Sequence, residues 1–308
     1  MEPTISDHQT SKQRITPAVV LQLLAGMALF GTATPLSKII GESYSVFSAS
    51  FARMAIASAV LTPFVIVATN RFSSATRKDL VVMAAIAGAG MVGFTATMLF
   101  GMTLTTGVIG STIMSAAPAV TALAAVVFLG ASVNARKISA LVLAVCGVTA
   151  INVFRGEASG GNAVLLGAGL VIIAVCFEAA YTLLSRQLSS GLSSPAATLG
   201  ASLMAAPLFI VLAVLFDPAP FDFSTSSIRA VSALLFWGAA TGGLAPVLWY
   251  RGVRSAPPAL AAGCMAIMPV TSLLLSYSLL DESFEWAHAL GFGLVFAGLM
   301  LMIWEHAK

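Results

Sequence analysis

Charged residues are scarce in this sequence of 308 residues: they make up 9% of the chain, while hydrophobic residues make up 58%. An ordinary soluble domain carries roughly a quarter charged residues. Because a soluble core cannot bury so much apolar surface, the composition excludes a soluble globular protein and indicates a protein embedded in a lipid bilayer. The 15 Lys and Arg residues are scattered and the net charge is only +3, which excludes nucleic acid as a partner.

Residues that hold metals or carry hydrolytic chemistry are also scarce. The three cysteines lie far apart with no CxxC pair, and the three histidines stand near a terminus or a helix end: Cys146, Cys176, Cys264, His8, His288 and His306. No GxSxG elbow, no GxxxxGK[ST] loop and no paired carboxylates inside an apolar stretch occur. We therefore expect no catalytic residues, no metal site and no cofactor, and the sequence predicts a protein that is not an enzyme and does not use ATP.

Apolar stretches long enough to cross a membrane dominate what is present. A helix needs about 20 mostly apolar residues to cross the hydrocarbon layer, and every backbone polar group there must be paired within the helix. Residues 1–16 are polar, lack a signal-peptide pattern and are expected to form a cytoplasmic tail. Ten spans are predicted, at 17–38, 44–68, 79–100, 103–127, 136–154, 163–186, 193–215, 228–250, 256–280 and 286–304.

The positive charges orient these ten spans. Lys and Arg favour the cytoplasmic side of short loops. With the N-terminus inside, most of the 15 basic residues fall on the cytoplasmic side, against Lys38, Arg155 and Arg229 outside, while Arg53 lies within a helix. We therefore expect a multi-pass protein of the inner membrane with both termini cytoplasmic.

An internal repeat appears when the chain is shifted against itself by about 151 positions. Gly101 then meets Gly252, Pro118 meets Pro269, and Leu129 meets Leu280. Each half holds five spans, an odd number, so the second half enters the membrane upside down relative to the first. The prediction is an all-α membrane protein of two inverted five-helix repeats, 17–154 and 163–304, with a site near the midplane between them.

The two copies of this pattern resemble the EamA-like family of the drug/metabolite transporter superfamily. The resemblance rests on PAVTALAAVVFLGASVNARKISALVLAVCGV and its copy PVTSLLLSYSLLDESFEWAHALGFGLVFAGL, in which a proline-led helix precedes a tight turn and a glycine-spaced helix. The second copy carries the family's turn glutamate as Glu282, while the first copy lacks it. Length and helix number are similar to the aromatic amino acid exporters of the YddG type. The resemblance implies a monomer that exposes a central cavity to each side of the membrane in turn.

Glu178 and Tyr181 are candidate substrate-binding residues on the sixth span. A charged side chain at the bilayer centre costs about 2.5–3.5 kcal/mol on insertion scales unless a cavity or a partner relieves it. The Glu178 carboxyl could exchange a proton or attract the amino group of a substrate, or it could be a hydrogen-bonded packing residue. Tyr181, three residues further, shares its helix face.

Arg53 and Lys38 are the basic candidates. Arg53 lies deep in the second span and could bind a substrate carboxylate. Lys38 ends the first span on the same side; it could share that role, although an anchor at the interface is the favoured interpretation. Pairing of Arg53 with Glu178 is disfavoured because their expected depths differ.

The fourth span combines small residues with a proline. Ser111 and Ser115 have the spacing of one helix face, which lets two helices approach closely and could also line the cavity. Pro118 and its counterpart Pro269 remove backbone hydrogen bonds and are either hinges for alternating access or static kinks.

Aromatic residues within spans, among them Phe94 and Trp237, could stack on an aromatic or cationic substrate or simply pack against lipid. Export of amino acids or related small metabolites by alternating access is the leading functional hypothesis. Efflux of hydrophobic or cationic drugs by the same fold is the alternative. The remaining partner is the lipid bilayer itself.

Overall fold

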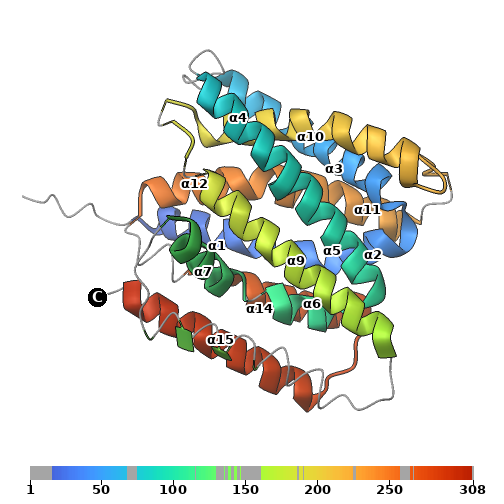
Figure 1. The fold of residues 1–308 in the computed structure, drawn as a ribbon, viewed down its shortest axis with the longest axis vertical. Helices are drawn as coiled ribbons and strands as arrows, with labels where there is room; N and C mark the ends of the chain where they lie inside the picture. The colour runs from blue at the N-terminus through green and yellow to red at the C-terminus, as the bar shows by residue number, and fades with distance from the viewer. Residues whose placement is uncertain are drawn as a thin grey trace, which may run out of the picture.

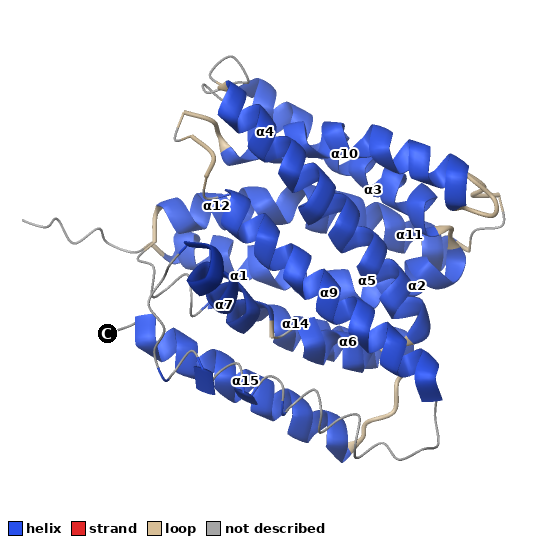
Figure 2. Cartoon of the chain, in the orientation of Figure 1, coloured by secondary structure: helices blue, strands red, loops and turns tan. Residues whose placement is uncertain are grey.

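Helices and their connections make up the part of the chain that the computed structural model describes, with no strand among those residues (Figure 2). The described residues are 16–67, 75–114, 116–129, 161–185, 187–189, 191–224, 227–256, 264–265 and 267–306, with isolated positions between 135 and 146. Within them, seven helical stretches are long and apolar enough to cross a membrane: Pro17–Ser43, Val46–Val67, Arg77–Leu104, Gly107–Phe128, Asn162–Ser185, Ser194–Phe216 and Ile228–Trp249. The expectation of an all-helical, multi-pass membrane protein is confirmed.

The helices of the first half follow the predicted spans closely. They are α1 (Pro17–Gly31), α2 (Ala33–Ser43), α3 (Val46–Val67), α4 (Arg77–Ala85), the π-helix η2 (Ile86–Gly93), α5 (Phe94–Leu104), α6 (Gly107–Met114) and α7 (Ala117–Leu129). The first span breaks at Thr32, between α1 and α2, and the fourth breaks between α6 and α7. The predicted fifth span, 136–154, lies almost entirely outside the described residues.

The second half of the chain, like the first, consists of α-helices and one π-helix in its described residues. They are α9 (Gly161–Ser185), α10 (Ser194–Phe216), α11 (Ile228–Phe236), the π-helix η3 (Trp237–Leu244), α12 (Ala245–Arg254), α14 (Ile267–Leu280) and α15 (Trp286–His306). The two π-helices begin at residues 86 and 237 and end at 93 and 244, so they lie 151 positions apart. Short π-helical segments inside α-helices are often found at functional sites.

Polar side chains at the ends of the spans explain where several helices begin. Thr76 and Asp79 form a capping box at the start of α4, and Ser227 caps α11 by accepting from the backbone N–H of Ala230. The Asp217 carboxylate, at the end of α10, accepts hydrogen bonds from the backbone N–H groups of Phe47 and Ser48 and so caps α3 from another helix. These caps satisfy N–H groups that a helix cannot pair internally.

Glycines let the π-helices approach their neighbours closely. A Cβ at Gly93 would lie 2.8 Å from the Phe177 ring of α9, and one at Gly238 would lie 2.7 Å from Ile56 Cβ of α3. A larger residue would require the Phe177 ring or the Ile56 side chain to move. η2 is therefore packed tightly against α9, and η3 against α3.

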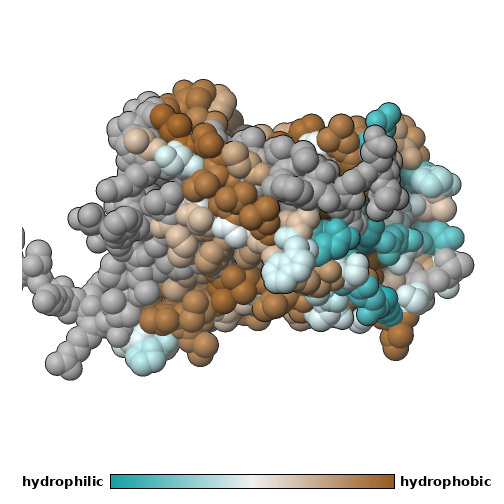
Figure 3. All heavy atoms as spheres, turned by 90° about the horizontal axis from the view of Figure 1, so that it is seen from below, coloured by the Kyte–Doolittle hydropathy of each residue, from teal (hydrophilic) through white to brown (hydrophobic). Residues whose placement is uncertain are grey.

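The helices form one bundle with α15 along one side and α4 and α10 along the opposite side (Figure 1). The helices in most extensive contact are α3 with α10, α5 with α9, α1 with α12, and α3 with η3; α6 also packs against α14. Seen from below, apolar residues cover the middle of the molecule and polar residues gather at one end (Figure 3). The apolar exposed belt, which includes Val211, Leu215 and Phe216 of α10, is what lipid contact requires.

Candidate substrate site

The Arg53 side chain is the point where three helical segments meet. Its Nη1 donates a hydrogen bond to Thr95 Oγ1 of α5 over 2.9 Å. Its guanidinium carbon lies 4.2 Å from the centroid of the Trp237 ring, the first residue of η3. The face of an indole ring attracts a cation, and more strongly where water is scarce. Arg53 and Trp237, both expected from the sequence, are thus brought together, and Thr95 joins them without having been predicted.

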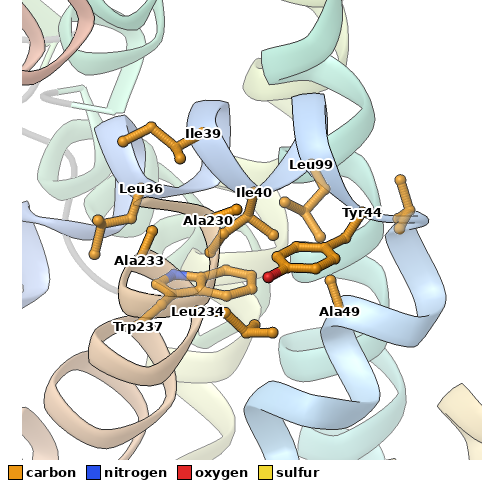
Figure 4. Close-up of a cluster of buried hydrophobic side chains, with 11 residues drawn as sticks. Leu36, Ile39, Ile40, Tyr44, Ala49, Leu99, Ala230, Ala233, Leu234 and Trp237 are labelled. Carbon is orange, nitrogen blue, oxygen red and sulfur yellow. The ribbon is translucent and has the colours of Figure 1, made fainter. Parts of the chain in front are cut away.

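Trp237 is fully buried in an apolar cluster. The side chains of Leu36, Ile40 and Leu234 surround it, and Tyr44 extends toward the indole ring, while the indole nitrogen lies on the side away from Tyr44 (Figure 4). This nitrogen, Nε1, has no hydrogen-bond partner among the described residues, and neither does Nε of Arg53. A buried donor left unpaired costs about 1–3 kcal/mol. Two unpaired donors on side chains in contact with each other therefore indicate that a ligand supplies the missing acceptors.

Glu178, on α9, also has a buried polar atom, Oε2, without a hydrogen-bond partner in the described part of the chain. The residues beside it on α9 pack against η2: the Phe177 ring meets Gly93, and Tyr181 meets Gly90. No ion pair between Glu178 and Arg53 is found in the described residues. The two charges therefore stand as separate polar points within the apolar bundle.

Lys38 lies in the middle of α2, which continues to Ser43, beyond the predicted end of the first span at residue 38. Its Nζ donates to the backbone carbonyl of Thr105 over 2.9 Å and lies 3.2 Å from the carboxylate of Glu42. The hydrogen bond ties the middle of α2 to the end of α5. These contacts favour the interpretation of Lys38 as an anchor rather than a substrate ligand.

Ser111 belongs to a buried hydroxyl cluster between α6 and α14. Ser272 Oγ donates to Ser111 Oγ over 2.7 Å, and Ser111 and Ser276 hydroxyls lie 2.9 Å apart. Ser272 and Ser276 were not predicted, although two serines at spacing four in an apolar helix are a detectable signal. The predicted site residue Ser115 lies outside the described residues.

The two predicted hinge prolines lie in the first turns of helices. Pro118 is the second residue of α7 and Pro269 is the third of α14. A proline costs least in a first turn, because those N–H groups have no partner within the helix. Both prolines thus lie where a proline disturbs a helix least, and their role as hinges stays a prediction.

Glu282 is a further residue with a defined role. From the turn after α14 its carboxylate accepts hydrogen bonds from the backbone N–H groups of Gly107 and Val108, the latter over 2.8 Å. These are the first two N–H groups of α6. The second half of the chain thus caps a helix of the first half, and the carboxylate also complements the positive end of the helix.

Phe94, the remaining predicted site residue, is half-buried against a cluster of α5, α6 and α9 that includes Met98, Ile113 and Val171. Its contacts are those of a packing residue. No group of His, Cys, Asp and Glu in the described part of the chain is arranged to hold a metal ion.

A bundle of apolar helices with isolated buried charges defines a multi-pass membrane protein. Comparison with known proteins narrows this class. The family model for the "EamA-like transporter family" matches the chain twice, over residues 17–153 and 165–304. The chain belongs to the EamA-like transporter family.

Two curated proteins of Bacillus subtilis (strain 168) are similar in sequence. "Uncharacterized transporter YetK" is 31% identical over 92% of this chain and 86% of its own length. "Uncharacterized transporter YyaM" is 24% identical over 83% of this chain and 84% of its own length. A solved structure titled "Crystal structure of protein" superposes with a TM-score of 0.66 at 15% identity, over 92% of this chain and 96% of that one, which shows a shared fold.

Proposed function

We propose that the chain is a secondary transporter that exports amino acids, aromatic ones among them, or related small metabolites. The observation that carries the proposal is the pair Arg53 and Glu178, two ionisable side chains inside apolar helices, each with a buried polar atom that no described residue satisfies. Such residues within membrane spans face a cavity or a pathway far more often than lipid. An amino acid carries the complementary groups, a carboxylate and an ammonium.

Two inverted five-helix repeats, 17–154 and 163–304, are the architecture that we propose, with ten spans and both termini cytoplasmic. The equal spacing of η2 and η3 supports it, as do α4 and α11, which begin after the hydroxyl caps Thr76 and Ser227, again 151 positions apart. The family model also matches the chain in two copies.

The single turn glutamate is also consistent with a repeat. Glu282 serves the N–H groups of Gly107 and Val108. In the register of 151, Gly107 corresponds to Pro258, and proline has no N–H group. Position 258 therefore has one N–H group fewer to satisfy, which is consistent with the missing glutamate of the first copy.

Alternating access would use the junction between α6, which ends at Met114, and α7, which begins at Ala117. We further propose that the protein acts as a monomer in the cell inner membrane, with no cofactor. Transport through such a repeat pair needs no ATP-binding loop.

Efflux of hydrophobic or cationic drugs is a second candidate. The buried carboxylate oxygen of Glu178, next to the aromatic residues Phe177 and Tyr181 on α9, would suit a cation with an apolar body.

Counterflow in liposomes tests both candidates. Purified protein is reconstituted, and exchange of labelled phenylalanine, threonine, a nucleoside and a cationic dye is measured. Exchange of the amino acids supports the leading proposal, and exchange of the dye alone supports drug efflux. If none of the four probes exchanges, transport of these classes is refuted.

A further inference from the structure

Two side chains in contact inside the bundle each carry an unpaired hydrogen-bond donor. The donors are Nε of Arg53 and Nε1 of Trp237, both buried and both without an acceptor among the described residues. The guanidinium carbon of Arg53 lies 4.2 Å from the centre of the indole ring, so the two side chains are stacked on each other. The close approach of η3 to α3 at Gly238 holds them there, since a Cβ at Gly238 would meet Ile56.

We infer that these two N–H groups form the subsite that binds the carboxylate of the transported substrate, an inference that rests on the proposed transport function. A carboxylate accepts hydrogen bonds through two oxygens, and a charged guanidinium strengthens them. No carboxylate of the described chain forms an ion pair with Arg53. In the proposed subsite the substrate carboxylate would neutralise this positive charge. Arg53 as a whole is half-buried, whereas its Nε is buried.

Thr95 is the positioning residue of this subsite. Its hydroxyl accepts from Nη1 and so fixes the rotation of the guanidinium plane. The face of the Trp237 ring, against which the guanidinium lies, restrains movement of the guanidinium toward the ring. With both restraints in place, the remaining donors of Arg53 keep one orientation, which favours a planar carboxylate over a neutral amide.

A binding experiment that does not depend on transport tests the subsite. The purified protein in detergent is heated with phenylalanine, threonine or phenylacetate, and in parallel with the carboxamide of each. We expect the acids to raise the melting temperature at concentrations about tenfold lower than the amides, the difference that one charge-assisted hydrogen bond makes. Equal stabilisation by acids and amides overturns the inference, and so does the absence of stabilisation by any acid.

Variants identify the residues involved. Trp237→Phe keeps an aromatic ring but removes the N–H, and Thr95→Val keeps the shape but removes the acceptor; each should weaken acid binding about tenfold and leave amide binding unchanged. Thr95→Ser should restore the preference for acids. Trp286→Phe, at a residue that is 81% exposed, is the matched control and should change nothing. Retention of the full acid preference in both Trp237→Phe and Thr95→Val would refute the assignment.

Different results would refute the proposed transport function and the proposed carboxylate subsite. Counterflow of a probe without any preference for acids would leave transport standing and remove the subsite. A clear preference for acids without counterflow of any probe would retain the subsite and remove the proposed transport of these substrates.

Discussion

The Glu282 carboxylate joins the two halves of the chain at the start of α6, and its removal has a calculable effect. It accepts from the N–H groups of Gly107 and Val108. A hydrogen bond to a charged group contributes about 1.5–3 kcal/mol, and replacing a helix cap by alanine costs about 0.5–2 kcal/mol. Because Glu282 is half-buried, water replaces part of the loss, and we expect Glu282→Ala to cost ~2 kcal/mol.

Thermal unfolding of the purified protein in detergent measures this loss. For a chain of 308 residues, with an unfolding entropy of about 2.1 cal/mol/K per residue, ~2 kcal/mol corresponds to a fall in Tm of ~3 °C. Glu282→Gln keeps one acceptor oxygen and loses the charge, so its Tm should lie between those of wild type and Glu282→Ala. Asp281→Asn is the control in the same turn, because Asp281 is exposed and its φ of 52° suits asparagine.

An unchanged Tm in Glu282→Ala would contradict the role of this carboxylate as the cap of α6. An equal fall in Asp281→Asn would show that any change in the turn is destabilising, and the two hydrogen bonds would then not be the cause.

Three other predictions follow from the packing and the buried polar groups. Gly167→Ala should destabilise the protein by about 1–3 kcal/mol, because the added Cβ would lie 2.8 Å from the carbonyl oxygen of Gly101. Gly169→Ala, on the same helix but with open space around it, should be neutral or stabilise the protein by up to about 1 kcal/mol. A Tm of Gly167→Ala no lower than that of Gly169→Ala would contradict this. Glu178→Gln should abolish proton-coupled exchange in liposomes while the variant stays folded, because an amide side chain cannot take up and release a proton as a carboxyl does. Unchanged exchange would remove Glu178 from the mechanism. Ser111→Ala should lower stability by about 1 kcal/mol, because the Ser272 hydroxyl loses its acceptor, and a Tm at or above that of wild type would contradict this.

The membrane class and the helix positions were predictable because they depend on local properties. Apolar length, hydroxyl caps and prolines act within one helix, and the predicted start of the eighth span, residue 228, coincides with the start of α11. The family resemblance was likewise carried by local motifs, and the family is confirmed. The ten-span count, the inverted repeat and the orientation stay predictions.

The breaks within spans were less predictable. The interruption at Thr32 and the two π-helices do not change the hydropathy of their spans, and hydropathy along the chain is what indicates a span. The π-helices coincide with close helix packing, since glycines such as Gly93 and Gly238 allow a neighbouring side chain to occupy the space of a missing Cβ.

The sequence by itself determined that this chain crosses a membrane as apolar helices, and which ionisable residues, Arg53 and Glu178, lie inside them, because both follow from composition along one helix. Only the tertiary structure decided which side chains meet. Thr95 and Trp237 are 42 and 184 positions from Arg53, and Glu282 is 175 from Gly107. Such contacts depend on the rotation and crossing of whole helices, which the pattern along a single helix does not specify.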